Sequence, residues 1–200
     1  MKQFTTITST CLPLRTENID TDQIIPARFL KTTLREGLGK YLFYNWRFNN
    51  KDKELQSQFN NSNYQTAKII VAGNNFGCGS SREHAVWALL DFGFKVIISS
   101  SFGDIFYNNS LKNGLLPVVL KPAELEELLT VIEKQPDTLV TVDLENETVT
   151  IAGLNKEYHF PIDSFRKTCL LKGVNELGYI LSFKEKIKSF EKDHQSFITK

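Results

Sequence analysis

A glycine-rich junction between a predicted strand and a predicted helix constrains the fold of this 200-residue chain most strongly. The apolar run KIIVA (68–72) leads directly into GNNFGCGSSREHAVWALLDFG (73–93), whose second half has the apolar spacing of a helix. Glycines let the backbone turn sharply and approach a ligand closely, and the junction contains three of them: Gly73, Gly77 and Gly79. The first N–H groups of a helix carry partial positive charge, and Arg82 adds a guanidinium. We therefore expect a carboxylate to bind at this junction.

The pattern on both sides of the junction predicts an α/β fold. Apolar runs alternate with helical patterns, as strands 68–72, 94–100 and 115–120 and helices 81–92, 103–112 and 122–135. Such alternation is typical of a parallel sheet. After Pro136 the apolar period changes to two, which predicts an antiparallel meander formed by LVTVDL, TVTIA and EYHF. Periodicity alone thus gives a parallel α/β core with an antiparallel addition.

Length and composition favour a single domain over residues 1–200. A chain of 200 residues, 41% of them hydrophobic, can bury one sizeable core. The polar, asparagine-rich stretch at 49–66 is typical of a surface excursion, and its simplest interpretation is a solvated loop. The charged segment at 183–194 has the pattern of a solvated helix. We see no internal repeat.

Charge and cysteine usage exclude several classes of function. Lysines and arginines number 24 against 23 acidic residues, which makes nucleic acid an unexpected partner. No stretch has the roughly 18 apolar residues of a membrane helix, and the N-terminus has no signal-peptide core, so we expect a cytoplasmic protein. Three isolated cysteines and three isolated histidines predict neither a disulfide framework nor a metal site.

Four interpretations of residues 73–84 compete. Ser80-x-x-Glu83 is the pattern of a helix capping box, which would be purely structural. The glycines loosely resemble a dinucleotide-binding turn, but their spacing is not GxGxxG. Covalent catalysis by Ser80 or Cys78 lacks a base that the sequence reveals. In the fourth interpretation Arg82 holds a substrate carboxylate while Ser80 moves a proton at the adjacent carbon.

The motifs taken together resemble one known family. The run GNNFGCGSSREHAVWAL, the stretch GFKVIISSSFGDIFYNNSLKNGLLPVVL (93–120) and NIDTDQIIPARFLK (18–31) are similar to the small subunits of 3-isopropylmalate dehydratase, in the aconitase superfamily. The likeness extends over nearly the whole chain, and the long segment at 34–66 resembles the bacterial form. The resemblance implies a three-layer β/β/α swivelling domain.

The resemblance also implies an activity and roles for individual residues. The family reaction isomerises 2-isopropylmalate and 3-isopropylmalate through 2-isopropylmaleate in leucine biosynthesis. Carried onto the matching positions, Ser80 is the catalytic base, Arg82 grips a substrate carboxylate, and Ser81 helps to bind the substrate. The loop after the DxDxxIP segment contacts the variable substituent of the substrate, which here implies substrate-binding roles for Leu30, Lys31 and Thr32.

The family reaction needs an iron of a [4Fe–4S] cluster held by three cysteines, and this chain has no suitable set of cysteines. The resemblance therefore implies that a partner large subunit holds the cluster and that this chain binds no cofactor itself. Related dehydratases of the citraconate/methylmalate or homoaconitate type, and a non-catalytic anion-binding assembly module, remain alternatives. We expect Asp20 and Asp22 to form a turn, Cys78 to be a small loop residue, and His84 to be a buried hydrogen-bonding residue.

Overall fold

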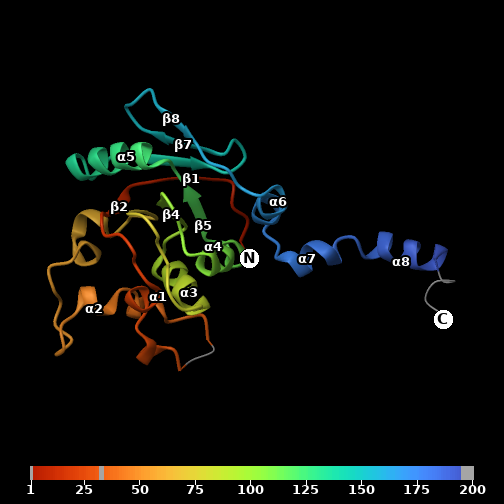
Figure 1. Cartoon of the computed structure of the whole chain (residues 1–200), viewed down its shortest axis with the longest axis horizontal. Helices are drawn as coiled ribbons and strands as arrows, with labels where there is room; N and C mark the ends of the chain where they lie inside the picture. Colours follow the sequence, from red (N-terminus) through yellow and green to blue (C-terminus); the bar gives the residue numbers. More distant parts are fainter. Residues whose placement is uncertain (1, 32–33, 195–200) are drawn as a thin grey trace.

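The structure is a computed structural model that describes residues 2–31 and 34–194, and within these ranges it contains two four-stranded sheets (Figure 1). The parallel sheet has the order β2-β3-β4-β5 and consists of Cys11–Leu14, Ile69–Ala72, Val96–Ser99 and Leu116–Val119. The antiparallel sheet has the order β1-β6-β7-β8 and consists of Thr6–Ser9, Val140–Asp143, Thr148–Ile151 and Glu157–His159. Each sheet pairs one strand near the N-terminus, β2 or β1, with strands from much later in the sequence, so neither sheet forms from one local segment.

Eight α-helices connect or flank these strands in the described part of the chain: α1 (Thr21–Ile24), α2 (Tyr44–Arg47), α3 (Glu83–Phe92), α4 (Asp104–Asn113), α5 (Pro122–Lys134), α6 (Ser164–Lys172), α7 (Glu176–Leu181) and α8 (Lys184–Asp193). Four short 3₁₀ turns lie before β3: η1 (Ala27–Phe29), η2 (Gly39–Tyr41), η3 (Gln58–Asn60) and η4 (Ser62–Tyr64). Helices α7 and α8 extend away from the body of the molecule (Figure 1).

Strand β3 shows how the parallel sheet divides the molecule into layers. Its side chains alternate, so Ile69 and Val71 join a core formed with the antiparallel sheet and α5. Ile70 joins a second core that includes residues of α3 and α4. Because the parallel sheet is covered on both faces, its central strands β3 and β4 are buried along their whole length and are almost entirely apolar. The antiparallel sheet, the parallel sheet and helices α3 and α4 thus form the three layers expected of the β/β/α fold, with α5 packed in the core shared by the two sheets.

Most predicted elements are confirmed, with three differences near the N-terminal half. Strand β2 was not among the predicted elements, although it pairs in parallel with β3. The residues expected to form a turn around Asp20 and Asp22 begin the short helix α1. Helix α3 begins at Glu83, two residues later than predicted.

The structure describes the two segments predicted to be solvated, residues 49–66 and most of 183–194. Residues 49–66 are mostly exposed, but Phe59 is buried and stacks on Phe43 with 4.4 Å between ring centroids. Helix α8 covers most of the segment predicted at 183–194 and exposes Phe190. In the described ranges no helix is long and apolar enough to cross a membrane. The cytoplasmic location stays a prediction.

Candidate active site

The glycine-rich loop runs from β3 to α3 and is enclosed by two other segments of the chain. The Gly77 N–H donates to the carbonyl of Ile19 at 2.7 Å. Gly77 has a φ of 73°, and a Cβ there would overlap the ring of Phe106, so the position requires glycine. A Cβ at Gly103 would lie 2.5 Å from the Gly77 carbonyl oxygen, so the two backbones meet closely. This packing fixes the path of the loop before it reaches Ser80.

Ser80 is held through its backbone. The buried Thr21 hydroxyl donates to the Ser80 carbonyl at 2.8 Å, and the Thr21 N–H donates to the Cys78 carbonyl at 3.0 Å. Ser80 and Ser81 are themselves exposed. The main chain is therefore anchored from the interior while both serine side chains are left at the surface.

The interpretation of Ser80 and Glu83 as a helix capping box is wrong. Residue Arg82 is the N-cap of α3, and it makes no side-chain capping bond. The Glu83 carboxylate does not reach back along the chain, because its Oε1 accepts from Asn113 Nδ2 at 2.7 Å. Within residues 2–31 and 34–194, no hydrogen-bond partner of the Ser80 hydroxyl is found. The Ser80 hydroxyl therefore does not cap helix α3, which leaves it available for a proton-transfer role.

Arg82 is positioned by Asp22, which comes from the start of α1. The Arg82 Nη1 atom lies 2.5 Å from Asp22 Oδ1, and the Arg82 side chain is only 20% exposed. The same Oδ1 accepts from the Ala27 N–H at 2.9 Å. The hydrogen bond from Ala27, followed by that from Arg82, lowers the pKa of Asp22 below its usual value. Asp22 thus stays ionised and orients the guanidinium.

The turn that follows Ala27 leads to the expected substrate loop. Turn η1 ends at Phe29, and the Leu30 N–H donates to the Ala27 carbonyl at 3.1 Å. Leu30 is partly buried and packs against the core beneath the loop, whereas Lys31 is exposed. Thr32 lies outside the described residues. Asp22 therefore holds Ala27, at the start of this turn, close to Arg82. Leu30 and Lys31 come directly after the turn in the sequence.

The aspartates of the DTD motif have separate roles. Asp20 is the N-cap of α1, where its Oδ1 accepts from the N–H groups of Asp22 and Gln23 at 2.7 and 2.8 Å. The Gln23 Oε1 accepts in return from the Asp20 N–H at 2.9 Å, which completes a capping box. The prediction that Asp20 serves local backbone structure is confirmed. For Asp22 the turn is only part of the role, because it also binds Arg82.

A polar network beside the glycine-rich loop escaped the sequence reasoning. The Asn74 Oδ1 accepts from the Ser101 hydroxyl at 2.6 Å, and the Asn75 side chain donates to Asn18 Oδ1 at 2.8 Å. These residues follow β2, β3 and β4, whose carboxyl ends lie at one edge of the parallel sheet. The shared position after neighbouring strands is the signal that could have identified the network.

The histidine and cysteines near or behind the site do not form a metal centre. His84 is half-buried, and its ring lies 4.7 Å from that of Trp87. Cys11 is buried in β2 and Cys169 is buried in α6, and burial raises the pKa of both thiols. Cys78 is in the glycine-rich loop, on a third element. Among residues whose positions are described, no group of three His, Cys, Asp or Glu side chains could hold a metal ion.

The chain matches known proteins along nearly its whole length. Residues 1–123 match the model of the aconitase C-terminal domain, and residues 126–164 match a model described as LeuD_N. The small subunit of 3-isopropylmalate dehydratase from Cytophaga hutchinsonii is 47% identical over 192 residues, covering 96% of each chain. The corresponding subunit from Cereibacter sphaeroides is 48% identical over 194 residues, again covering 96% of each chain.

The chain belongs to the family of 3-isopropylmalate dehydratase small subunits. A crystal structure of 3-isopropylmalate dehydratase (leuD) from Methanocaldococcus jannaschii has the same fold. The two structures share 28% sequence identity with a TM-score of 0.65, and the match covers 93% of this chain and 99% of the archaeal chain. Both the family expected from the motifs and the swivelling α/β fold are confirmed. The relatives are named as small subunits, which implies a large subunit as partner.

Proposed function

We propose that this chain is the small subunit of a hydro-lyase that interconverts 2-isopropylmalate and 3-isopropylmalate through 2-isopropylmaleate in leucine biosynthesis. Family membership supports the reaction. The observation that carries the residue assignment is the exposed Ser80 hydroxyl, uncommitted to the helix end, two residues before the oriented Arg82. In this proposal Ser80 is the base, Arg82 binds a substrate carboxylate, and Ser81 helps to hold the substrate.

The surroundings of Arg82 suit a carboxylate ligand. Only Nη1 of its guanidinium has a partner among the described residues, namely Asp22. The remaining donors can present a planar fork to a carboxylate, while Asp22 prevents the side chain from turning away. Negative charge builds on the substrate carboxylate when the adjacent carbon loses its proton, and a fixed guanidinium stabilises that charge.

Ser80 would accept the proton from the carbon next to that carboxylate. A serine hydroxyl is a very weak acid, so its alkoxide needs nearby positive charge. Arg82 and the first N–H groups of α3 supply such charge in this part of the chain. In the hydration direction the Ser80 hydroxyl returns the proton to carbon, and the Ser80 alkoxide is regenerated.

The departing hydroxide requires a Lewis acid, which in this superfamily is an iron of a [4Fe–4S] cluster. The cysteines of this chain do not fit such a cluster, because among the described residues Cys11, Cys78 and Cys169 do not come together as a group of metal ligands, and Cys11 and Cys169 are buried in the protein interior. We place the cluster in the large subunit, which would also cover the exposed Ser80 and Ser81. The purified chain alone should therefore be colourless and inactive; an iron–sulfur absorbance band in it would contradict this assignment.

Recognition of the substituent on the substrate belongs, in this proposal, to Leu30, Lys31 and Thr32. The partly buried Leu30 offers an apolar contact for an isopropyl group. The exposed Lys31 can contact the partner or the second substrate carboxylate. The whole loop follows the Ala27 turn that Asp22 ties to Arg82.

The test replaces Ser80 in the enzyme assembled from this chain and its large subunit, with hydration of 2-isopropylmaleate as the assay. Ser80→Ala and Ser80→Asn should each lower kcat by at least about two orders of magnitude, the lower range for removing a proton-transfer group. Neither should lower Tm, because the hydroxyl caps no helix. Ser62→Asn, at another exposed serine, is the matched control and should behave as wild type.

Two outcomes would contradict the proposal. A kcat within a few-fold of wild type in Ser80→Asn would remove Ser80 as the base. Activity of the assembled wild type on citraconate but not on 2-isopropylmaleate would assign the chain to a related dehydratase instead.

A further inference from the structure

The turn that leads into the substrate loop rests on an aromatic platform formed by Tyr41 and Tyr44. The Phe29 ring stacks on Tyr41 with centroids 4.1 Å apart and planes inclined by only 9°. The Tyr44 ring lies 4.9 Å from Phe29 at a tilted angle. Phe29 is the last residue of η1 and directly precedes Leu30. The position of Leu30 is therefore linked to the face of Tyr41.

Arg28 closes the stack from the solvent side. Its guanidinium carbon lies 4.6 Å from the centre of the Phe29 ring and 5.4 Å from that of Tyr44. Its Nη2 donates to Asn45 Oδ1 at 2.6 Å. The Phe29 ring is thus held by Tyr41 and by Arg28, and its freedom to change rotamer is reduced.

The platform is fixed to the same helix that follows Arg82. Gly39, at the start of η2, donates its N–H to Asp91 Oδ2 at 2.7 Å. A Cβ at Gly39 would lie 2.7 Å from the backbone nitrogen of Phe92, so this close approach to the end of α3 requires glycine. Arg82 is the N-cap residue at the other end of α3. Helix α3 therefore connects Arg82 to turn η2, which contains Tyr41.

A second connection runs through α1. The Phe43 N–H donates to the carbonyl of Ile24 at 2.7 Å, where α1 ends. Near its start, α1 carries Asp22, which binds Arg82. The platform, the turn and Arg82 therefore form a closed set of contacts. The Phe29–Tyr41 stack supports the turn from one side, and Asp22 ties the turn to Arg82.

We infer that Tyr41 is a positioning residue for substrate selection: its ring, stacked under Phe29, sets where Leu30 and Lys31 lie relative to Arg82. This inference rests on the proposed function. Tyr41 acts through the loop and does not touch the substrate. It also gives the long 34–66 segment a role beyond that of a solvated excursion, since part of this segment supports the substrate loop.

The experiment compares two substrates of the same reaction in the assembled enzyme. The ratio of kcat/KM for 2-isopropylmaleate to that for its methyl homologue, citraconate, reports recognition of the substituent. Loss of an aromatic pair supports a change of about two- to tenfold. Tyr41→Leu should lower this ratio by that factor. Phe29→Leu should do the same, because it removes the other ring of the stacked pair. Tyr41→Phe should restore the wild-type ratio.

Phe48→Leu is the matched control. Phe48 packs on Tyr44 in the same aromatic cluster, whereas the rings that contact Phe29 in the described structure are those of Tyr41 and Tyr44. It should leave the ratio unchanged. An unchanged ratio in both Tyr41→Leu and Phe29→Leu would overturn the inference, as would an equal fall in Phe48→Leu.

Arg82→Lys in the same assay separates this inference from the function on which it rests. Near-normal kcat/KM in Arg82→Lys would refute the proposed function, whatever happens at Tyr41. If Arg82→Lys loses activity while Tyr41→Leu keeps the wild-type ratio, the proposed function stands and only the inference about Tyr41 fails.

Discussion

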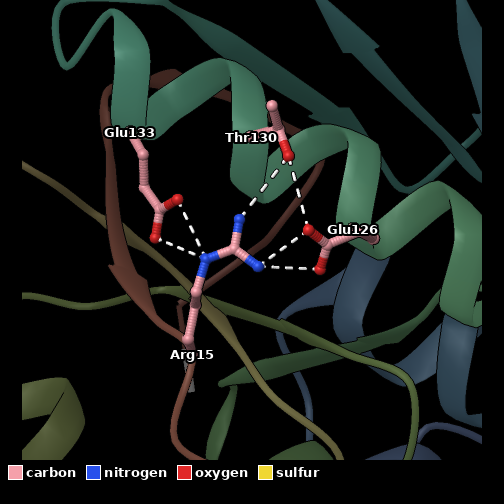
Figure 2. Close-up of polar contacts among 4 residues, drawn as sticks. All are labelled: Arg15, Glu126, Thr130 and Glu133. Atoms are coloured by element: carbon pink, nitrogen blue, oxygen red, sulfur yellow. Dashed lines mark hydrogen bonds and ion pairs between the residues drawn. The ribbon is translucent and has the colours of Figure 1, made fainter.

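Two arginines lie beyond the carboxyl ends of neighbouring parallel strands, and their surroundings differ sharply. Arg15 directly follows β2, and three side chains of α5 surround it (Figure 2). Its Nε donates to both oxygens of Glu133 at 2.8 and 2.9 Å, and its Nη1 donates to both oxygens of Glu126 at 2.8 Å. Its Nη2 lies 3.5 Å from the Thr130 hydroxyl. Every nitrogen of this guanidinium has a partner within the chain.

Arg82, beyond β3, has one carboxylate partner among the described residues, Asp22. The Arg15 contacts raise its pKa further above the ordinary arginine range, first through the hydrogen bond to Glu133 and then through that to Glu126. The difference teaches how to separate a structural arginine from a functional one. A guanidinium whose donors are all used joins two elements, whereas one that is oriented but only partly used can still bind a ligand.

The largest effect should come from Arg82→Lys. An ammonium keeps the charge but cannot copy a planar fork, so transition-state stabilisation should fall by about 2–4 kcal/mol. The measurement is kcat/KM for 2-isopropylmaleate hydration in the assembled enzyme, with Tm as the test of folding. If the variant keeps kcat/KM within a few-fold of wild type, the two arginines do not differ in the way described.

The same change at the other site, Arg15→Lys, should affect stability instead. Exposed ion pairs contribute about 0.2–1 kcal/mol each, so losing two well-aligned pairs should cost about 1 kcal/mol. For a chain of this size that corresponds to a fall in Tm of about 2–4 °C. Thermal unfolding of the chain measures it, and kcat/KM of the assembled enzyme should remain at the wild-type value. A large loss of activity with unchanged Tm would show that Arg15 has a functional rather than a structural role.

The smallest effect on stability should come from Asp22→Asn, seen as a pH dependence of the free energy of unfolding. The hydrogen bond from Ala27 and then that from Arg82 lower the pKa of Asp22 below 3.8. A lowered pKa means that the ionised form stabilises the fold at neutral pH, and that this contribution is lost as pH falls below about 4. Because the Asp22 side chain is 52% exposed, we expect less than about 1 kcal/mol.

The measurement is the difference in Tm between wild type and Asp22→Asn from pH 7 down to pH 3. The difference should be constant near neutrality and should shrink in the acid range. A difference that grows as pH falls would show that the carboxylate is not stabilised by these donors.

The central part of the fold could be predicted from the sequence because its signals are local. Strand β3 and helix α5 follow from apolar periodicity, and Pro122 begins α5 as its fixed φ favours. Strand β2 was not predicted. It contains Pro13, which is tolerated there because β2 is an edge strand. Helix α1 has a local signal in the sequence, the capping-box pair Asp20 and Gln23.

The position of the site could be predicted from the sequence, but the contacts between its side chains could not. The motif singled out Ser80 and Arg82, yet the capping interpretation failed because Glu83 binds Asn113, thirty positions later in the sequence. The ion pair between Asp22 and Arg82 spans 60 positions. Pairings of this kind depend on tertiary packing, which no local pattern encodes, and the role of Arg15 is hidden for the same reason.

Substrate binding in the two arginine variants tests the central claim most directly. Affinity for 2-isopropylmalate is measured by calorimetry on assembled enzyme carrying either Arg15→Lys or Arg82→Lys. A hydrogen-bonded charged partner contributes about 1.5–3 kcal/mol, so Kd should rise about tenfold or more in Arg82→Lys. Kd should be unchanged in Arg15→Lys. Equal weakening in both variants, or no weakening in Arg82→Lys, would contradict the account.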